Sequence, residues 1–340
     1  MITRRPPPTR RRRPALEEKA MLILFIAVTT ILFMLPFAPT AGLFLRRRQA
    51  LGPSPLSEGA YAPDHFARNL IAKLRARAAL IAQPLITVFE YRLDGEPLLI
   101  LPASMRRVPS ECATKMSYAL ADAVLPTALP CDKEIAAEGS LLTGGNASYR
   151  ALYAADTLHI GGNSTVIRWC HADTHLKVDK GCRILGRASA NKTIKVDAPC
   201  LFMTLTAPTI LIGSAEPRMG GAKTGDLASA TGTDHVAREP VSLAAGTRLR
   251  GSIKAYGQLC VGAESVIEGA LVCEGDIVIG PGCLIWGPIV AEGDVRIAEG
   301  CEVGRPDDPG SVVGEDIEIV APAVIHGAVH ARHNGIVTEM

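Results

Sequence analysis

The chain of 340 residues has few aromatic side chains, which make up 4% of it. A surface that stacks nucleic-acid bases needs exposed rings, so this composition argues against one. The nine cysteines are odd in number and include no CxxC pair, which indicates neither a zinc ribbon nor a disulfide scaffold. The small net charge of +2 comes from residues 1–20, which hold seven Arg/Lys against two Glu. We therefore expect no nucleic-acid partner.

From residue 240 onward the sequence repeats about every 18 residues. Leucine or a β-branched residue recurs at the second, fourth and tenth repeat positions, and glycine recurs between them. The columns are Leu259, Ile277, Val295 and Ile317; Val261, Ile279, Ile297 and Ile319; and Ile267, Ile285, Val303 and Ile325. Each repeat divides into three units of about six residues, enough for one short strand and one corner, and glycine suits corners with positive φ.

This period predicts an all-β solenoid, a three-sided β-helix with about 18 residues per coil. One coil cannot bury its inward face alone, so the core exists only as a stack. Neighbouring residues of a strand face opposite sides. The constant columns therefore place Ile279 and Ile285 in the lumen, whereas Val278 and Glu292 point outward.

The solenoid is predicted in two parts, over residues 133–213 and 240–340, because apolar pairs already recur at steps of 18 from Leu158. Residues 214–239 between them are rich in Gly, Ala and Thr and nearly free of large apolar side chains, as in a flexible insertion. Replacing this insertion with a short Gly/Ser bridge is expected to leave the unfolding midpoint nearly unchanged, since loop length has a weak effect on stability.

Residues 21–45 are an uncharged, apolar run between the Arg/Pro-rich tail, expected to be disordered, and Arg46–Arg48. A helix of this length reaches about 37 Å, enough for a hydrocarbon core of about 30 Å. We predict a transmembrane helix, which makes membrane lipid a partner of residues 21–45. A cleavable signal peptide is the alternative, but the run is long for one and the following arginines disfavour cleavage.

More basic residues precede the span than follow it, so the positive-inside rule favours a cytoplasmic N-terminus. The chain is then a single-pass protein of the bacterial inner membrane with a periplasmic β-helix. The arginines at 46–48 favour the opposite orientation, with a cytoplasmic β-helix.

Residues 64–132, behind a linker at 46–63, are predicted to form a small α+β module. Asp64–Gln83 has helical apolar spacing with basic residues near its end, and Asp94-Gly95 marks the turn of a hairpin. A second helix is expected over Glu111–Leu125. The first helix either lies on anionic lipid or packs on its own domain, and we favour the second interpretation.

The spaced glycines and apolar pairs of Gly246–Gly304 resemble those of the bactofilin family of bacterial polymer-forming cytoskeletal proteins. This resemblance implies a right-handed three-sided β-helix that polymerises end to end without nucleotide and scaffolds envelope or shape-determining machinery. It covers about a third of the chain closely. The membrane span, the module and the split solenoid depart from the family pattern.

The alternative class is a left-handed hexapeptide-repeat acyltransferase, because the unit IGPGCL also fits its six-residue repeat. Such an enzyme needs a histidine as general base. His326, His330 and His333 form the densest cluster, and we interpret them, like His171 and His175, as solvated side chains. No catalytic, metal-binding or cofactor-binding residue is assigned.

Four cysteines, Cys182, Cys200, Cys283 and Cys301, occupy the eighth repeat position, where other coils have Ser, Thr or Ala. We interpret them as small inward side chains at a corner. Cys112 and Cys131 form either a disulfide or two buried thiols.

Together these features predict a membrane-anchored, non-catalytic β-helix scaffold or polymer-forming protein of the bacterial envelope. It is expected to associate with itself through the β-helix ends and with envelope proteins that the sequence does not identify. The alternative is a membrane-tethered hexapeptide-repeat acyltransferase acting on a cell-surface glycan.

Overall fold

The computed structural model describes residues 62–80, 87–217 and 234–339, together with residues 21, 24–26 and 28–30. The chain divides into two units, Met1–Tyr61 and Ala62–Met340. The few described residues of the first unit are helical, and most of the predicted span, with the tail and the linker, lies outside the described residues. In the part of the chain that the structure describes, no helix is long and apolar enough to cross a membrane, so the anchor stays a prediction.

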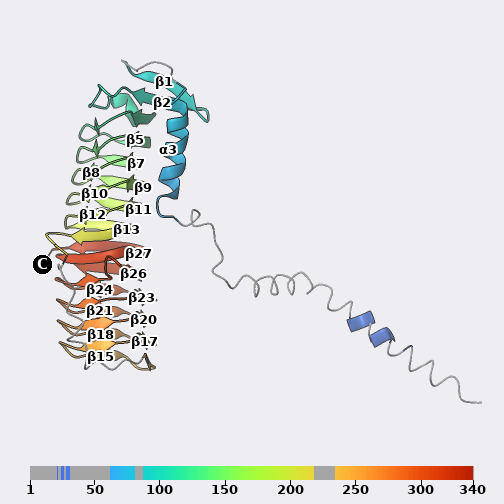
Figure 1. Ribbon diagram of the computed structural model, residues 1–340, viewed down its shortest axis with the longest axis vertical. Coiled ribbons are helices and arrows are strands. Elements are labelled where there is room, and N and C mark those ends of the chain that lie inside the picture. Colours follow the sequence, from blue (N-terminus) through green and yellow to red (C-terminus); the bar gives the residue numbers. More distant parts are fainter. Residues whose placement is uncertain are drawn as a thin grey trace, which may run out of the picture. The chain divides into compact units, whose positions relative to one another are not determined.

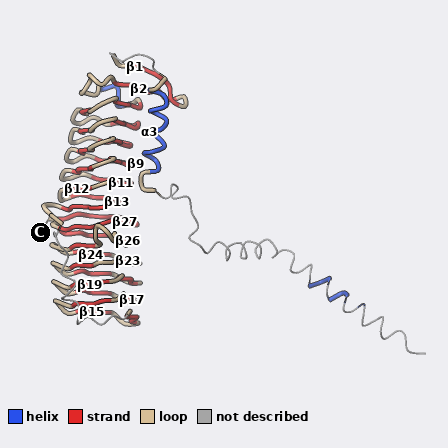
Figure 2. Tube along the Cα trace, viewed as in Figure 1, coloured by secondary structure: helices blue, strands red, loops and turns tan. Residues whose placement is uncertain are grey.

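The unit Ala62–Met340 is a β-solenoid of about twelve turns, in which short strands alternate with turns (Figures 1 and 2). Successive coils pair in parallel at the predicted period: Leu259 lies opposite Ile277, and Ile277 opposite Val295. A typical coil supplies three strands, one per side. The predicted all-β solenoid and its repeat length are therefore confirmed, whereas its handedness stays a prediction.

The lumen holds the apolar columns that the repeat predicts. Ile279 and Ile285 are 1% and 0% exposed, whereas Val278 is half-buried and Glu292 is exposed. Corners between strands use glycine where the chain turns sharply, as at Gly282 with φ of +72°. Each inward side chain contacts the coils on either side of it, so the core is one continuous column.

Helix α3 (His65–Ala78) packs on the side of the solenoid and buries Ala67, Ile71 and Leu74. This confirms the interpretation that it packs on its own domain. Its buried face differs from the predicted one, because Phe66 is 52% exposed. Asp64 does not cap the helix with its side chain but forms an ion pair with Arg68.

The predicted hairpin is confirmed: β1 (Phe89–Leu93) pairs antiparallel with β2 (Glu96–Leu101) across Asp94-Gly95. The predicted helix over Glu111–Leu125 is wrong. A 3₁₀ turn, η2 (Ser110–Ala113), is followed there by β3 (Met116–Ala119). The reason is tertiary, since β3 pairs in parallel with β2 and β5 and these ladders override local helical preference. The parallel stack thus begins at β2, before Lys133.

The remaining strands of this first half step along the stack in chain order. They are β4 (Ala123–Val124), β5 (Cys131–Ala137), β6 (Leu141–Leu142), β7 (Ser148–Ala154), β8 (Leu158–Ile160), β9 (Thr165–Ala172), β10 (His175–Val178), β11 (Arg183–Ala190), β12 (Thr193–Val196) and β13 (Cys200–Ile212).

The second half contains fourteen named strands. They are β14 (His235–Ala237), β15 (Val241–Leu243), β16 (Arg248–Arg250), β17 (Ile253–Ala255), β18 (Leu259–Val261), β19 (Val266–Glu268), β20 (Leu271–Cys273), β21 (Ile277–Ile279), β22 (Leu284–Ile285), β23 (Ile289–Ala291), β24 (Val295–Ile297), β25 (Glu302–Val303), β26 (Gly310–Val320) and β27 (Ala323–Thr338).

The two halves meet at their last coils. Strand β13 pairs with β27 in an antiparallel ladder, with Cys200 opposite Val337, Leu205 opposite Val329 and Ile212 opposite Ala323. The halves therefore run in opposite directions along one stack, and the C-terminus lies in its middle, beside β13 (Figure 1). We call this antiparallel β13–β27 pairing the seam.

The seam places the start of the second half at the far end of the stack, six ladder steps from β13. The coils resume at His235, because β14 pairs in parallel with β17, so the predicted limit of the insertion at residue 239 is wrong. Residues 218–233 lie outside the described residues. The described strands on either side of them, β13 and β14, lie a whole second half apart.

Candidate functional site

The C-terminal histidines lie on β27, where His326 and His330 contact residues of β13 across the seam. His326 is only 1% exposed, with Nε2 at 3.1 Å from Glu302 Oε1 and Nδ1 at 3.2 Å from Thr209 Oγ1. His330 Nδ1 lies 2.8 Å from Thr204 Oγ1. The prediction of a solvated side chain is wrong for His326, because β13 covers β27. His330 and His333 are exposed, as predicted.

The pair of His326 and Glu302 has the residue types of a general base and its carboxylate. Both ring nitrogens of His326 are already engaged, however, by Glu302 on one side and by β13 on the other. A cavity of about 160 Å³ is lined by Glu302, Cys301 and Ser214, but not by the imidazole. The arrangement joins β13, β25 and β27, and we assign it to the stability of the seam.

A second histidine, His171, sits beneath α3 in a chain of hydrogen bonds. Its Nδ1 lies 2.7 Å from Ser189 Oγ and its Nε2 lies 3.1 Å from Asp173 Oδ1, and Tyr153 donates its hydroxyl to Asp173 at 2.7 Å. Burial lowers the pKa of His171. A neutral ring that donates from Nε2 to Asp173 and accepts the Ser189 hydroxyl at Nδ1 accounts for both bonds.

The order serine, imidazole and carboxylate is that of a hydrolase triad. Ser189 and His171 are both buried, at 3% and 2% exposed, and neither lines the groove beside α3. A nucleophile without access to substrate cannot act, so these residues are part of the interface with α3. The prediction of a solvated side chain is wrong for His171 and confirmed for His175, which is exposed.

An ion pair holds the other end of α3. Arg75 donates to both carboxylate oxygens of Glu138, from Nε at 2.7 Å and from Nη2 at 2.8 Å, and Tyr118 donates its hydroxyl to the same carboxylate. The hydrogen bond from Arg75 lowers the pKa of Glu138. Two parallel bonds fix the angle of the helix as well as its position.

A groove of about 390 Å³ runs beside α3 and includes Trp169. Cations line it, but carboxylates pair with three of them: Lys73 with Asp94 at 2.8 Å, Lys133 with Glu96 at 2.6 Å and Arg150 with Glu134 at 3.0 Å. This pairing leaves little positive potential to attract an anion. Among the described residues, no group of three or more His, Cys, Asp or Glu is placed to hold a metal ion.

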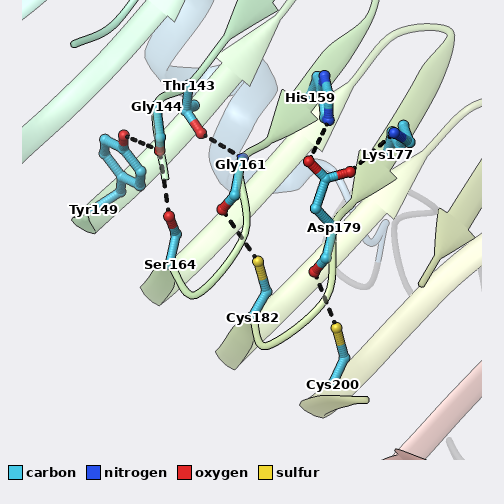
Figure 3. Close-up of polar contacts among 10 residues, drawn as sticks. All are labelled: Thr143, Gly144, Tyr149, His159, Gly161, Ser164, Lys177, Asp179, Cys182 and Cys200. Atoms are coloured by element: carbon cyan, nitrogen blue, oxygen red, sulfur yellow. Dashed lines mark hydrogen bonds and ion pairs between the residues drawn. The ribbon is translucent and has the colours of Figure 1, made fainter. Parts of the chain in front are cut away.

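Small polar side chains form a column at one corner of the lumen (Figure 3). Ser164 donates to Gly144 O at 3.3 Å, Cys182 to Gly161 O at 3.3 Å and Cys200 to Asp179 O at 3.2 Å. Cys283 and Cys301 donate to carbonyls of preceding coils in the same way. The prediction that these cysteines are small inward residues is confirmed, and their thiols satisfy corner carbonyls.

Cys112 and Cys131 are two free, buried thiols, which is one of the two predicted alternatives. The neighbouring thiol of Cys112, together with burial, raises the pKa of Cys131. Cys112 lies in η2, at the beginning of the stack, where its side chain helps to close the lumen.

At the opposite end of the stack, the described residues leave the outer strand edges unpaired. Strands β14, β15 and β16 each have one neighbour in the described part of the chain, namely β17, β18 and β19. Val241 and Leu243 occupy the lumen columns of Leu259 and Val261 but are only half-buried. We call this surface, formed by residues 235–250, the open end.

The beginning of the stack is closed by contrast. The lumen residues Leu101, Val108 and Cys112 are buried there, and Met105 packs over them. Strand β1 has one neighbour among the described residues, β2, and it is a single strand with mostly exposed side chains that covers one side only. The two ends of the solenoid are therefore not equivalent.

Comparison of the chain with models of protein families, with curated proteins and with solved structures gives no match. The resemblance to the bactofilin family thus stays a prediction from the sequence.

Proposed function

We propose that this chain is a non-catalytic scaffold of the bacterial cell envelope, anchored in the membrane by residues 21–45, that associates with itself through an end of its β-helix. The observation that carries the proposal is the open end, where three strands have one neighbour each among the described residues and the lumen residues Val241 and Leu243 are only half-buried.

Exposed strand edges present unpaired N–H and C=O groups and are ready templates for another strand. Solenoids ordinarily protect their terminal coils with a polar cap. Here Val241 and Leu243 are half-buried instead. Association of this surface would bury both side chains and pair the free backbone groups, so it is favoured by apolar burial and by hydrogen bonding alike.

The anchor is supported by the absence of charge in residues 21–45 and by the basic clusters on both sides. The acyltransferase alternative receives less support. It needs a histidine that contacts the acceptor group, whereas His326 and His171 are buried and line neither the groove beside α3 nor the cavity beside Glu302.

Two measurements on the full chain test the proposal. Alkaline phosphatase fused after Met340 is expected to be active in intact bacterial cells, and the chain should stay in the membrane pellet after alkaline carbonate washing. Release by carbonate would overturn the anchor, and an inactive fusion would overturn the periplasmic orientation. Sedimentation of the purified chain in mild detergent should show self-association, and a monomer at every concentration would overturn the scaffold.

A further inference from the structure

We infer that Cys283 and Cys301 are a peroxide-sensitive thiol pair that closes to a disulfide between two adjacent coils. The inference goes beyond the proposed function and does not depend on the membrane anchor or on self-association. It concerns a covalent state of the second half, in which the structure shows both residues as thiols at the same corner of consecutive coils.

The parallel ladder brings the two cysteines together. Leu284 of β22 lies opposite Glu302 of β25, and Glu302 N donates to Cys283 O at 2.9 Å. The cysteines directly precede this pair of residues, so their Cα atoms are one ladder spacing apart, about 4.8 Å. A disulfide joins Cα atoms that are about 4.4–6.8 Å apart. The backbone of the solenoid is therefore already at a suitable distance.

Both side chains point into the same corner of the lumen. Cys283 and Cys301 are 0% and 2% exposed, and their thiols donate to Gly262 O and Gly280 O, each at 3.2 Å. The neighbouring thiol of Cys283, together with burial, raises the pKa of Cys301. Cβ atoms spaced like the strands lie slightly farther apart than the mean of about 3.8 Å in disulfides. The bond is therefore expected to be strained and easily reduced.

A cavity gives a small oxidant access to this pair. The next coil has Ala323 at the same position, because Glu302 pairs with Val324. This smaller side chain leaves room beside Cys301, and the cavity of about 160 Å³ is lined by both residues. A water molecule occupies about 30 Å³ in the liquid, and hydrogen peroxide, which has one oxygen atom more, fits well within this volume.

The reaction with hydrogen peroxide takes two steps. The thiolate of Cys301 attacks one peroxide oxygen and the O–O bond breaks, so that Cys301 becomes a sulfenic acid and the leaving hydroxide takes up the proton that the thiol released. The sulfur of Cys283 then attacks that of Cys301. An S–S bond forms, the S–O bond breaks, and the hydroxyl leaves as water with the proton of Cys283. Two thiols and one peroxide thus give one disulfide and two waters.

A second pair in the same fold provides an internal comparison. Cys182 and Cys200 also occupy the same position of consecutive coils, and their thiols likewise donate to corner carbonyls (Figure 3). Neither of them lines the cavity beside Cys301. Access through this cavity predicts that the pair at 283 and 301 oxidises faster than the second pair, whereas ladder geometry alone predicts similar rates.

Exposure of the full chain in mild detergent to hydrogen peroxide tests the inference. The remaining thiols are blocked, and mass spectrometry identifies the disulfide-linked peptides, with and without prior treatment by a dithiol reductant. Cys301→Ser removes the pair, and Cys200→Ser is the matched control. Serine already occupies this corner at Ser265, one coil before Cys283, so both variants should fold, which thermal unfolding verifies.

We expect a reducible link between Cys283 and Cys301 in the wild type and in Cys200→Ser, formed before any link between the second pair and lost in Cys301→Ser. Because the pKa of Cys301 is raised, its thiolate fraction and the rate should increase about tenfold per pH unit around neutral pH.

Three results would overturn the inference. They are complete recovery of both thiols after peroxide, oxidation of Cys301 to a sulfinic acid without a link to Cys283, and a link from Cys301 to another cysteine. Equal rates for the two pairs would overturn the cavity as the route of access.

Discussion

The path from β13 to β14 makes the length of the connecting segment a sensitive property of this fold. Because the halves meet at the seam, the chain leaves Ile212 in the middle of the stack and re-enters at His235 at its far end. We predict that shortening this segment has no effect down to a threshold length and then detaches the terminal coils. This prediction replaces the sequence-based expectation that a short Gly/Ser bridge is harmless.

The threshold follows from the ladder. Six steps of about 4.8 Å separate β13 from β14, or about 29 Å. An extended chain covers about 3.4 Å per residue, so about eight bridging residues are the minimum. The natural segment, residues 213–234, has ample length. A bridge of four residues reaches only about 17 Å, and the shortfall of about 12 Å equals two to three coils.

The assay is a series of Gly/Ser bridges of about 22, 12 and 4 residues between Ile212 and His235, lengths chosen on either side of that minimum. Thermal unfolding and hydrogen exchange of residues 241–268 are measured for each. The bridge of about 22 residues controls for composition. This bridge and the one of about 12 residues should give nearly the unfolding midpoint and the protection of the wild type, because loop length has a weak effect on stability. The shortest should lose protection in the terminal coils. Full protection and an unchanged midpoint with the shortest bridge would refute the antiparallel order of the halves.

Three further predictions concern single side chains. Ile279→Asp should cost several kcal/mol of unfolding free energy, as an unpaired buried charge does, whereas Val278→Asp should cost under about 1 kcal/mol; equal melting temperatures for the two variants would contradict the inward and outward columns. Arg75→Met should loosen α3 and speed its proteolytic removal more than Arg77→Met does, and equal cleavage rates would contradict the role of the Arg75 ion pair. Burial lowers the pKa of His171, so the unfolded state binds its proton more readily and stability falls as pH decreases through about 6.5; His171→Gln should flatten this slope between pH 7.5 and 5, and an unchanged slope in thermal melts would contradict it.

The sequence was sufficient to predict the coil but not the order in which the coils stack. Inward columns such as Ile277 and Ile279 follow from alternation along a strand. That alternation is the same in parallel and antiparallel ladders, so it carries no information about which way the next coil runs. Within an uninterrupted repeat, the short connection between coils shows that each coil packs on the one before it. The segment of residues 213–234 is too long to show which coil packs on which, so the sequence did not predict the antiparallel seam.

The same reason explains which site residues were found and which were missed. The cysteine column was predictable, because each thiol meets a carbonyl of a preceding coil. The burial of His326 was not, since Thr209 comes from the other half of the chain. One signal was present in the sequence: Cys200–Ile212 contains no glycine, unlike the coils of the second half, and it is the coil that forms the seam.

The open end likewise depends on the order of the halves. If the coils simply continued in chain order, β14 would lie next to β13 and the end of β27 would be exposed. The seam exchanges these roles, covering β27 and exposing β14, β15 and β16. Strand β1 does not provide an equivalent second surface, because it covers one side of the first coil, and the segment around η2 fills the lumen beneath it. An antiparallel joint inside one chain thus leaves, among the described residues, unpaired strand edges at the end formed by β14, β15 and β16 rather than at the end of β27.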